Sequence, residues 1–312
     1  MHIIDLHCDT LYKTVTNNIP LDAKENEVLF EPDRADCKLQ CYAIWLPDSF
    51  DGEKAEKTVL SAAEILRAEC NRLGIHLLQQ GGAIRNQFSL AHNCAILTIE
   101  NGSALNGKLE NVQRFADIGV KMMTLTWNAH NLIGDGVGVE KPQGITGFGC
   151  SVLHEMERTG IVVDISHASE KLFYDVAENT HRPFVASHSN AYSITHHRRN
   201  LTDEQFKILE QRNGLVGINF HNAFLNDDPD KANINDIIKH IEHFLALGGE
   251  NCLCFGSDFD GGTLPKDIKN SRIYDKIYEL CLKQGYSDAL IQKIFYENAL
   301  KFFENFDNHQ IM

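Results

Sequence analysis

The sequence predicts a (β/α)8 barrel that forms one domain over residues 1–312 and closes with C-terminal helices. Short apolar, β-branched runs alternate with helix-like segments, and no Pro-, Ser- or Gly-rich linker divides the chain. Five of these runs, spread over the whole length, finish on His, Asp or Glu before a polar turn. The carboxyl ends of parallel strands form the site-bearing face of such a barrel, so these side chains are expected at one mouth.

Eight runs fit buried strands, because they are short, apolar and bounded by turn residues. They cover residues 2–9, 39–46, 94–99, 120–127, 161–166, 184–187, 215–220 and 252–257. The stretch that follows the first run, up to residue 36, is rich in Asn, Asp and Lys and is expected to be a polar connection.

Amphipathic segments between the runs predict helices. They cover residues 53–73, 109–118, 169–179, 234–247, 271–284 and 288–304. A Gly-rich loop over 134–149 precedes a further helix that ends near Gly160. Gly119 is placed as the C′ glycine of the helix before it, and Thr202 with Gln205 matches the capping box of another helix.

A doubly wound open sheet is the alternative architecture. That fold usually carries a Gly-rich phosphate loop directly after its first strand. In this chain the first strand leads into His7, Cys8, Asp9 and Thr10 instead. The barrel is therefore the favoured fold.

Charge and cysteine content exclude several classes of function. The net charge of −14 and the pI near 5.5 argue against binding to nucleic acid or to an anionic membrane, which require basic patches. Nine scattered cysteines match no disulfide scaffold, so we expect reduced thiols and a cytoplasmic location. The sequence shows no signal peptide, no run of membrane-spanning length and no GPI signal, which agrees with that location.

Five residues at strand ends are candidate metal ligands. His7 and Asp9 are two apart on one strand and point to the same face. Glu100 ends a buried strand, and its carboxylate can offer one oxygen to each of two cations. His167 and His188 end consecutive strands in similar settings, Ile-Ser-His-Ala-Ser and Ala-Ser-His-Ser-Asn. The set divides into His7, Asp9 and Glu100 on one metal, and Glu100, His167 and His188 on the other.

Other polar residues near the strand ends are candidates for catalysis and binding. Asp258, in Gly-Ser-Asp-Phe-Asp-Gly, is placed to move a proton from a metal-bridging water to a leaving amine. The pair Arg198 and Arg199 fits either a clamp for a carboxylate or a solvated loop charge. His130 and His221 follow strands and are candidate substrate contacts.

Three further side chains receive structural interpretations. Asp260 is followed by two glycines and is expected to be a turn residue or a partner of the site. His240 and His243 lie three apart on an amphipathic helix and are expected to face solvent.

The sequence resembles the membrane (renal) dipeptidase family of the amidohydrolase superfamily nearly from end to end. The resemblance rests on short motifs whose order and spacing are together specific. They are DLHCDT at 5–10, IENG at 99–102, TLTWN at 124–128, DISH at 164–167, SHSNA at 187–191, RRNL at 198–201 and GSDFDG at 256–261.

The resemblance implies two zinc ions bridged by Glu100 and a hydroxide, cleavage of dipeptides, and a homodimer. It also implies that Arg199 grips the C-terminal carboxylate of the dipeptide. The chain departs from the mammalian relatives at Trp127, where they carry a His that polarises the scissile carbonyl or binds the intermediate, and Asn128 or His130 is the candidate replacement. It has His221 where relatives often carry a Tyr.

We therefore expect a binuclear zinc dipeptidase that acts on free dipeptides, with Asp258 as proton shuttle. Another reaction on the same metal pair is the nearest alternative, either deacylation of an N-acyl amino acid or opening of a lactone. A non-catalytic metal- or peptide-binding barrel is the alternative from a different class. The requirement for a free amine separates a dipeptidase from a deacylase.

Overall fold

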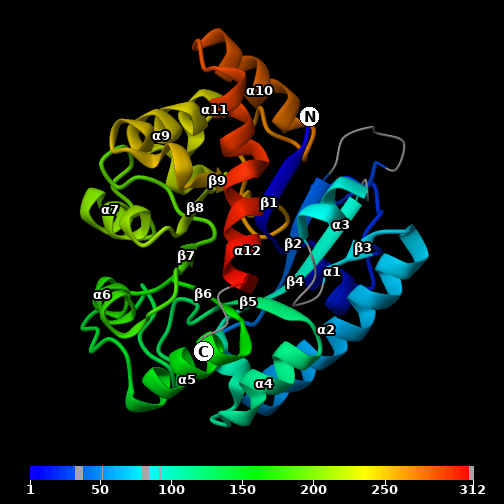
Figure 1. The fold of residues 1–312 in the computed structure, drawn as a ribbon, viewed down its shortest axis with the longest axis vertical. Coiled ribbons are helices and arrows are strands. Elements are labelled where there is room, and N and C mark those ends of the chain that lie inside the picture. The colour runs from blue at the N-terminus through cyan, green and yellow to red at the C-terminus, as the bar shows by residue number, and fades with distance from the viewer. Residues whose placement is uncertain (32–37, 51, 79–83, 91–92, 309–312) are drawn as a thin grey trace.

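Parallel strands close into a barrel in the computed structural model, which describes residues 1–31, 38–50, 52–78, 84–90 and 93–308 (Figure 1). Eight strands of this described part form the ring, and the last pairs with the first. In order around the barrel they are β1 (Ile3–Cys8), β2 (Lys38–Trp45), β4 (Asn93–Glu100), β5 (Val120–Thr124), β6 (Val162–Asp164), β7 (Val185–Ala186), β8 (Leu215–Ile218) and β9 (Leu253–Phe255). The predicted fold class is confirmed.

The short strand β3 (His76–Leu77) lies outside the ring. It pairs in parallel with β4 at Cys94 and Ala95, whereas β5 pairs with β4 from Leu97 onward. One edge of β4 thus carries two strands in succession, and its other edge pairs with β2. The hydrophobic pattern of the sequence does not predict this strand, which is only two residues long.

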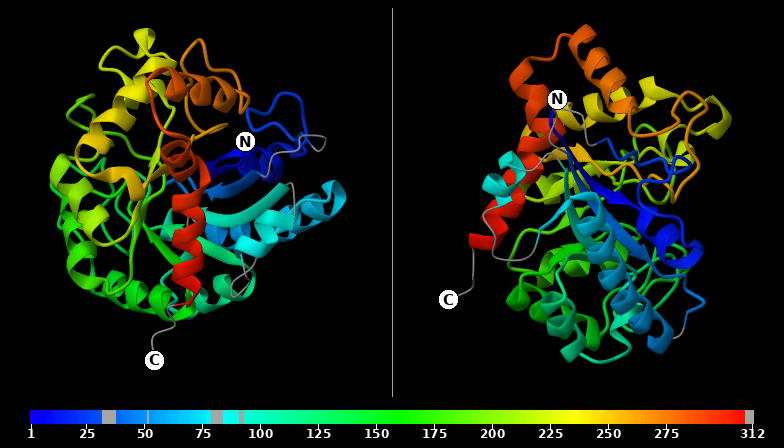
Figure 2. Two further views of the ribbon diagram at one scale, coloured as in Figure 1. Left: turned by 45° about the horizontal axis from the view of Figure 1, so that its top comes forward. Right: turned by 90° about the vertical axis from the view of Figure 1, so that its right-hand side faces the viewer.

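Helices surround the strands on the outside (Figures 1 and 2). They are α1 (Thr10–Asn17), α2 (Gly52–Leu73), α3 (Ile84–Leu90), α4 (Glu110–Asp117), α5 (Gly147–Thr159), α6 (Glu170–Asn179), α7 (Asp203–Gln211), α8 (Asn222–Leu225), α9 (Ile234–Ala246), α10 (Ile273–Lys283), α11 (Asp288–Gln292) and α12 (Asn298–Asn308). The predicted capping box of α7 is present, with Thr202 and Gln205 bonded to each other's backbone. Gly119 after α4 has φ 101°, a left-handed conformation that glycine adopts without strain.

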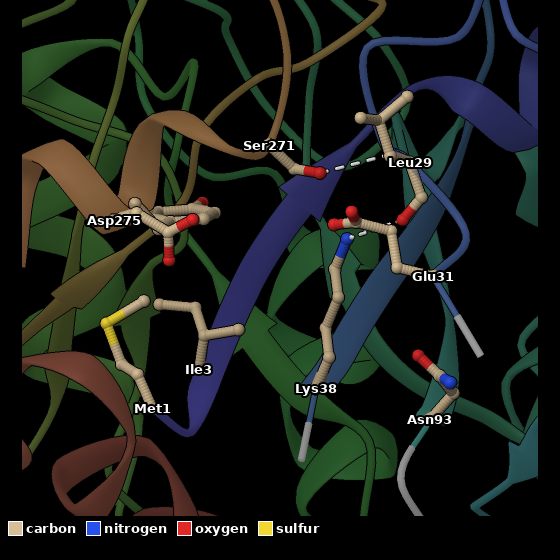
Figure 3. A pocket seen from close by; sticks show the side chains of 9 residues that line it. Met1, Ile3, Leu29, Glu31, Lys38, Asn93, Ser271 and Asp275 are labelled. Carbon is tan, nitrogen blue, oxygen red and sulfur yellow. Dashed lines mark hydrogen bonds between the residues drawn. The ribbon is translucent and has the colours of Figure 1, made fainter. Parts of the chain in front are cut away.

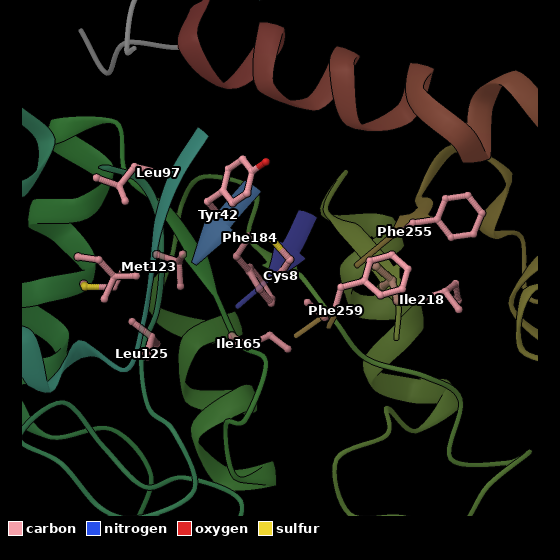
Figure 4. Packing of buried hydrophobic residues seen from close by; sticks show 14 of the residues in the cluster. Cys8, Tyr42, Leu97, Met123, Leu125, Ile165, Phe184, Ile218, Phe255 and Phe259 are labelled. Atoms are coloured by element: carbon pink, nitrogen blue, oxygen red, sulfur yellow. The ribbon is translucent and has the colours of Figure 1, made fainter. Parts of the chain in front are cut away.

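Two apolar cores lie on the two sides of the sheet. The larger one packs the outward faces of the strands against the helices, and Figure 4 shows part of it around Phe184, Phe255 and Phe259. The smaller one holds residues from every strand of the ring, including Ile4, Val185 and others, and therefore fills the barrel interior.

The C-terminal helix α12 closes the amino end of the barrel. Leu300, Phe303 and Phe306 belong to the inner core, and the helix crosses in front of the strands in Figure 1. At this end the ammonium of Lys121, near the start of β5, pairs with Asp307 on α12. The opposite, carboxyl-terminal end of the barrel is left for a site.

A β-bulge in β1 decides which of its side chains face the site. Asp5 pairs with Gln40 and Cys8 pairs with Tyr42, so three steps along β1 match two steps along β2. Before the bulge, Ile4 belongs to the inner core, and after it Cys8 belongs to the outer core. A regular strand would place positions 4 and 8 on the same face, so the extra residue re-aims the end of β1.

Two predictions about local structure are wrong. The stretch expected to be a polar connection contains α1, which buries Leu11 and Thr14. His240 does not face solvent: it is fully buried, accepts a hydrogen bond from Ala191 N at 3.1 Å and contacts Leu225 O at 3.2 Å. In the described part of the chain, no helix has the length and apolarity needed to cross a membrane.

Candidate metal centre

Six side chains from five strand ends meet at the carboxyl-terminal mouth of the barrel. They are His7 and Asp9 from β1, Glu100 from β4, His167 after β6, His188 after β7 and Asp258 after β9. All six are buried, with exposed fractions of 9% or less. Buried carboxylates close to one another repel, so this arrangement favours a cation between them.

Glu100 lies at the centre of the cluster. Its Oε2 is 3.5 Å from His7 Nε2. Its Oε1 is 2.9 Å from His167 Nε2 and 3.7 Å from His188 Nε2. The two oxygens therefore face different histidines, an orientation suited to bridging two ions.

Several buried side-chain nitrogen and oxygen atoms in the cluster, each able to bind a metal ion, lack a hydrogen-bond partner. They include Nε2 of His7, Nε2 of His188 and Oδ1 of Asp9. Leaving such atoms unpaired away from water is costly unless a ligand joins them. Two groups have donor atoms within 4.8 Å of one another, one made of His7, Glu100 and His188, the other of His7, Asp9 and Asp258. Imidazoles with carboxylates form a donor set that suits zinc and related divalent ions.

Burial and neighbouring charges shift the pKa values of the three imidazoles in different directions. Burial, with a contribution from the charge of Arg199, lowers the pKa of His167 and of His188 well below the usual value, which keeps both rings neutral. Burial also acts to lower the pKa of His7, but the attraction of Glu100 and Asp9 outweighs it and raises that pKa well above normal. Burial raises the pKa of Glu100 to about 7. A metal that replaced the proton on His7 would relieve this competition.

Asn128 fixes the ring of His167. Its Oδ1 lies 2.8 Å from His167 Nδ1, so it accepts the Nδ1 hydrogen and leaves Nε2 free to face Glu100. Orientation of a metal-binding histidine through its other ring nitrogen is common in metalloproteins. The structure thus places Asn128, expected to contact substrate, against a candidate ligand as well as in the wall of a cavity.

Asp258 is held in a strained position. Its φ of 63° and that of His167, 67°, lie in the left-handed region that non-glycine residues rarely adopt. Asn219 donates a hydrogen bond from Nδ2 to Asp258 Oδ2 at 3.0 Å, which leaves Oδ1 free, 4.0 Å from His7 Nε2. Asn219 directly follows β8, but no role is predicted for it from the sequence, because it lies inside the predicted run 215–220 and is neither an imidazole nor a carboxylate.

A cavity of about 450 Å³ opens beside the cluster. Asp9, Glu100, His167 and Asp258 contribute to its wall. Its other lining residues include Tyr12, Lys13, Trp45, Trp127, Asn128, His221 and Phe224. The rings of Trp45 and Trp127 meet edge to face at 5.1 Å, so one side of the cavity is aromatic.

A second cavity, of about 460 Å³, shares His167 with the first and contains both arginines of the predicted pair. Arg199 is buried, donates to the backbone oxygen of His188 at 3.2 Å, and has an unpartnered Nε. Arg198 is bonded to the backbone oxygen of Val137 at 3.2 Å. A buried guanidinium with a free N–H beside the metal cluster fits the binding of a carboxylate.

His130 is not brought to the cluster. Its side chain is 61% exposed, its Nδ1 lies 2.7 Å from Asp135 Oδ1, and it lines a different cavity with Asp48 and Asn101. Trp127 and Asn128, earlier in the same loop, do line the first cavity, but the ring of His130 is paired with Asp135, so proximity to a strand end was misleading here. His221 does reach the first cavity.

A small pocket of about 40 Å³ lies at the other end of the barrel (Figure 3). Ile3, Lys38 and Asn93, at the amino ends of β1, β2 and β4, contribute to its wall, and Ser271 accepts a hydrogen bond from Leu29 N nearby. It is separated from the metal cluster by the length of the strands, so it has no part in the chemistry of the cluster.

A cluster of buried imidazoles and carboxylates at the carboxyl end of a (β/α)8 barrel, with a cavity beside it, defines a metal-dependent hydrolase. The chain belongs to the membrane dipeptidase family, peptidase family M19, whose family model matches residues 1–310. It is a hydrolase that acts on peptide bonds.

Three relatives illustrate the similarity. A metallopeptidase from Rhodobacter sphaeroides, solved with a phosphinate mimic of the dipeptide L-Ala-D-Ala, is 25% identical with a TM-score of 0.90, covering 97% of this chain and 99% of that one. The dipeptidase AC, an M19 metallopeptidase, is 26% identical with a TM-score of 0.89, covering 97% and 98%. An uncharacterized Klebsiella pneumoniae protein from the pqqA 5′ region is 32% identical over 216 residues, which are 66% of this chain and 80% of that protein.

Proposed function

We propose that this protein is a binuclear zinc dipeptidase that hydrolyses the peptide bond of free dipeptides. His7, Asp9 and Glu100 would hold one ion, and Glu100, His167 and His188 the other. The family supports a metal-dependent dipeptidase, and the number and identity of the ions are the proposed part.

The orientation of Glu100 carries the proposal. One of its oxygens faces His7 and the other faces His167 and His188, at distances of 2.9 to 3.7 Å. The Nε2 atoms of His7 and His188 both lack a hydrogen-bond partner, and the shortest contact of each is to a different oxygen of Glu100. One ion at each oxygen would satisfy both nitrogens.

Zinc ions held there would lower the pKa of a coordinated water towards about 7 and so would supply hydroxide at neutral pH. Asp258 is the group of this chain that moves the proton. Asn219 occupies its Oδ2, so Oδ1 accepts the proton of the attacking water and returns it to the leaving amine. The left-handed backbone at Asp258 holds this oxygen towards the cluster.

Arg199 is proposed to bind the C-terminal carboxylate of the substrate. Its guanidinium is buried next to His188, and its Nε lacks a partner in the structure. The first cavity, with its aromatic side at Trp45 and Trp127, would take the N-terminal residue. The Rhodobacter neighbour holds a mimic of a dipeptide with a D-residue in second place, so such dipeptides belong among the substrates to be tested.

A substrate panel with and without chelator tests the proposal. The purified protein is loaded with Zn²⁺, its metal content is measured by elemental analysis, and release of amino acids is followed from L,L- and L,D-dipeptides and from N-acyl amino acids. We expect two zinc ions per chain and turnover of free dipeptides that the chelator abolishes. Preference for N-acyl amino acids would favour a deacylase, and no metal-dependent turnover of any dipeptide would overturn the proposal.

Asp258→Asn provides the matched variant. The amide retains the shape of the side chain but cannot accept the proton, so we expect kcat to fall by about 10²- to 10⁴-fold with both zinc ions retained. Unchanged kcat with two ions bound would remove Asp258 from the mechanism.

The cytoplasm is the proposed location. Free thiols in the described part of the chain include those of Cys8, Cys41, Cys70, Cys150, Cys252, Cys254 and Cys281, all of which are buried except Cys150. Cys37 lies outside the described residues. Free thiols agree with a reducing compartment.

A further inference from the structure

A chain of hydrogen bonds leads from a buried carboxylate to one of the candidate metal ligands. Ser187 Oγ lies 2.6 Å from Asp164 Oδ2 and 2.8 Å from His188 Nδ1. Asp164 ends β6, while Ser187 and His188 follow β7, and all three side chains are almost completely buried. No water is needed to complete the path, because each step is a direct contact.

The direction of the hydrogens follows from the partners of Asp164. Its Oδ1 accepts the backbone N–H groups of Ser166 at 3.0 Å and of Ser187 at 2.9 Å. Its Oδ2 accepts the hydroxyl of Thr124 at 2.6 Å in addition to that of Ser187. A carboxylate surrounded by four donors acts only as an acceptor, so the single hydrogen of the Ser187 hydroxyl points to Asp164.

The Ser187 oxygen then has only lone pairs to offer its other neighbours. Ser166 Oγ, 3.3 Å away, itself accepts the backbone N–H of His188 and is free to donate to Ser187. The remaining lone pair of Ser187 faces His188 Nδ1, which must therefore carry the hydrogen. The Nε2 of His188 is left with a lone pair, and it is this atom that is buried, unpartnered and 3.7 Å from Glu100 Oε1.

We propose that Asp164 and Ser187 are positioning residues that hold His188 in the Nδ1–H tautomer, so that its Nε2 is ready to bind a metal ion. The inference rests on the proposed function in taking His188 as a ligand. His167 obtains the same tautomer directly from Asn128, whereas His188 obtains it through a serine hydroxyl. Partners of this kind typically change metal affinity by about 10- to 100-fold.

Asp164→Asn tests the direction of the chain. The amide oxygen has to stay on the side of the two backbone N–H groups, so the NH₂ group replaces Oδ2 and donates to Ser187. The Ser187 hydroxyl then points to His188 Nδ1, and the ring is driven to the Nε2–H tautomer, which must give up that hydrogen before Nε2 can bind a metal. Ser187→Ala keeps the charge of Asp164 and removes the link.

Two measurements report on the variants. The ¹⁵N NMR spectrum of histidine ring nitrogens in the metal-free protein, with His188 assigned by its loss in His188→Gln, gives the tautomer. Competition with a chelating dye and elemental analysis give zinc affinity and stoichiometry. We expect Nδ1–H in the unmodified protein, Nε2–H in Asp164→Asn, and in both variants a loss of about 10- to 100-fold in affinity at one of two zinc sites.

Thr124→Val is the matched control, because it removes another donor to the same oxygen of Asp164 but leaves the path through Ser187 intact. Its zinc affinity should equal that of the unmodified protein. Retention of Nδ1–H in Asp164→Asn, or of both zinc affinities in Ser187→Ala, would overturn the inference. If Asp164→Asn does not fold, the zinc affinities of Ser187→Ala test the inference by themselves. Absence of zinc binding by the unmodified protein would instead overturn the proposed function, and the NMR result would still stand.

Discussion

Asp5 and Asp164 make the same set of four hydrogen bonds at two different points of the barrel. In each case Oδ1 accepts the backbone N–H two residues further along the chain and the N–H of a serine on the neighbouring strand end, Ser257 or Ser187. Oδ2 accepts the hydroxyl of that serine at 2.6 Å and one further hydroxyl. Each carboxylate therefore ties two strand ends together directly beneath the metal cluster.

The two serines differ in what they hold. Ser187 contacts the ring of His188, while Ser257 precedes Asp258 and bonds to Asp5 and to the backbone oxygen of His7 at 3.3 Å. Ser257→Ala should therefore lower the free energy of unfolding by about 1.5–3 kcal/mol, through the lost bond to a buried carboxylate, with both zinc ions retained. Urea denaturation and elemental analysis measure the two effects. Loss of a zinc ion in this variant would contradict the distinction between the serines.

Asn128 is expected to act on metal affinity. Asn128→Ala removes the acceptor from His167 Nδ1, and we expect zinc to bind about 10- to 100-fold more weakly. Asn128→Asp keeps an oxygen in the same place and should largely retain the affinity. Dye competition distinguishes the variants. A rise in KM for dipeptides with unaltered zinc affinity in Asn128→Ala would show that Asn128 contacts substrate alone.

Asn219 is expected to act on turnover. Its hydrogen bond fixes Asp258, so Asn219→Ala should reduce kcat by about 10- to 100-fold with two zinc ions still bound. Steady-state kinetics and elemental analysis on the same preparation provide the test. An unchanged kcat in Asn219→Ala would contradict the role of Asn219 in fixing Asp258.

Removal of metal should destabilise the folded protein. A metal that binds only the folded state at 100 times its Kd contributes about 2.7 kcal/mol, so a chelator should lower Tm by roughly 5 °C or more. Glu100→Gln weakens both proposed sites at once, and chelator should leave its Tm unchanged. Calorimetry with and without chelator measures both proteins. An equal chelator effect on the two would place the metal elsewhere.

The buried His240 predicts loss of stability in mild acid. Burial lowers the pKa of His240 to about 4, below the value of about 6.5 in an unfolded chain. The unfolded state then binds more protons between these values, so stability is fully present above pH 6.5 and falls by about 3 kcal/mol as the pH drops towards 4. Denaturation curves at pH 7.5, 6 and 5 should show this slope, and His240→Gln should reduce it.

His243→Gln, on the same helix, is the control for that experiment. Its side chain is partly exposed and bonded to Asp203 at 2.8 Å, outside the core that surrounds His240. We expect it to keep the acid slope. An equal reduction of the slope by both substitutions would assign the effect to the helix rather than to His240.

Much of the barrel could be predicted because buried parallel strands leave a clear pattern. Runs such as 94–99 and 252–257 are apolar on both faces, and their lengths and flanking turns separate them from helices. The helix α1 was missed because Thr10–Asn17 contains several β-branched residues, which favour other conformations in isolation. Packing of Leu11 in the outer core stabilises the helix there.

The residues of the candidate site could be predicted from the sequence, but their positions relative to one another could not. A His, Asp or Glu that ends a buried strand is identifiable from the sequence, and the structure brings the six such residues together. His130 satisfied a looser form of the same rule, proximity to a strand end, but its ring is paired with Asp135 and lines a different cavity. Asn219 falls outside this rule, because it is an amide that lies one residue before the end of the predicted run, and it was therefore overlooked.

The sequence by itself determined which residue types stand at the strand ends, and therefore the chemistry available at the mouth of the barrel. Only the tertiary structure decided how they are used: the bulge that re-aims β1, the two faces of Glu100, and the hydroxyl that links Asp164 to His188. The physical reason is that periodicity along a chain reports local conformation and burial. Strand register and the direction of a hydrogen bond depend on partners far away in sequence.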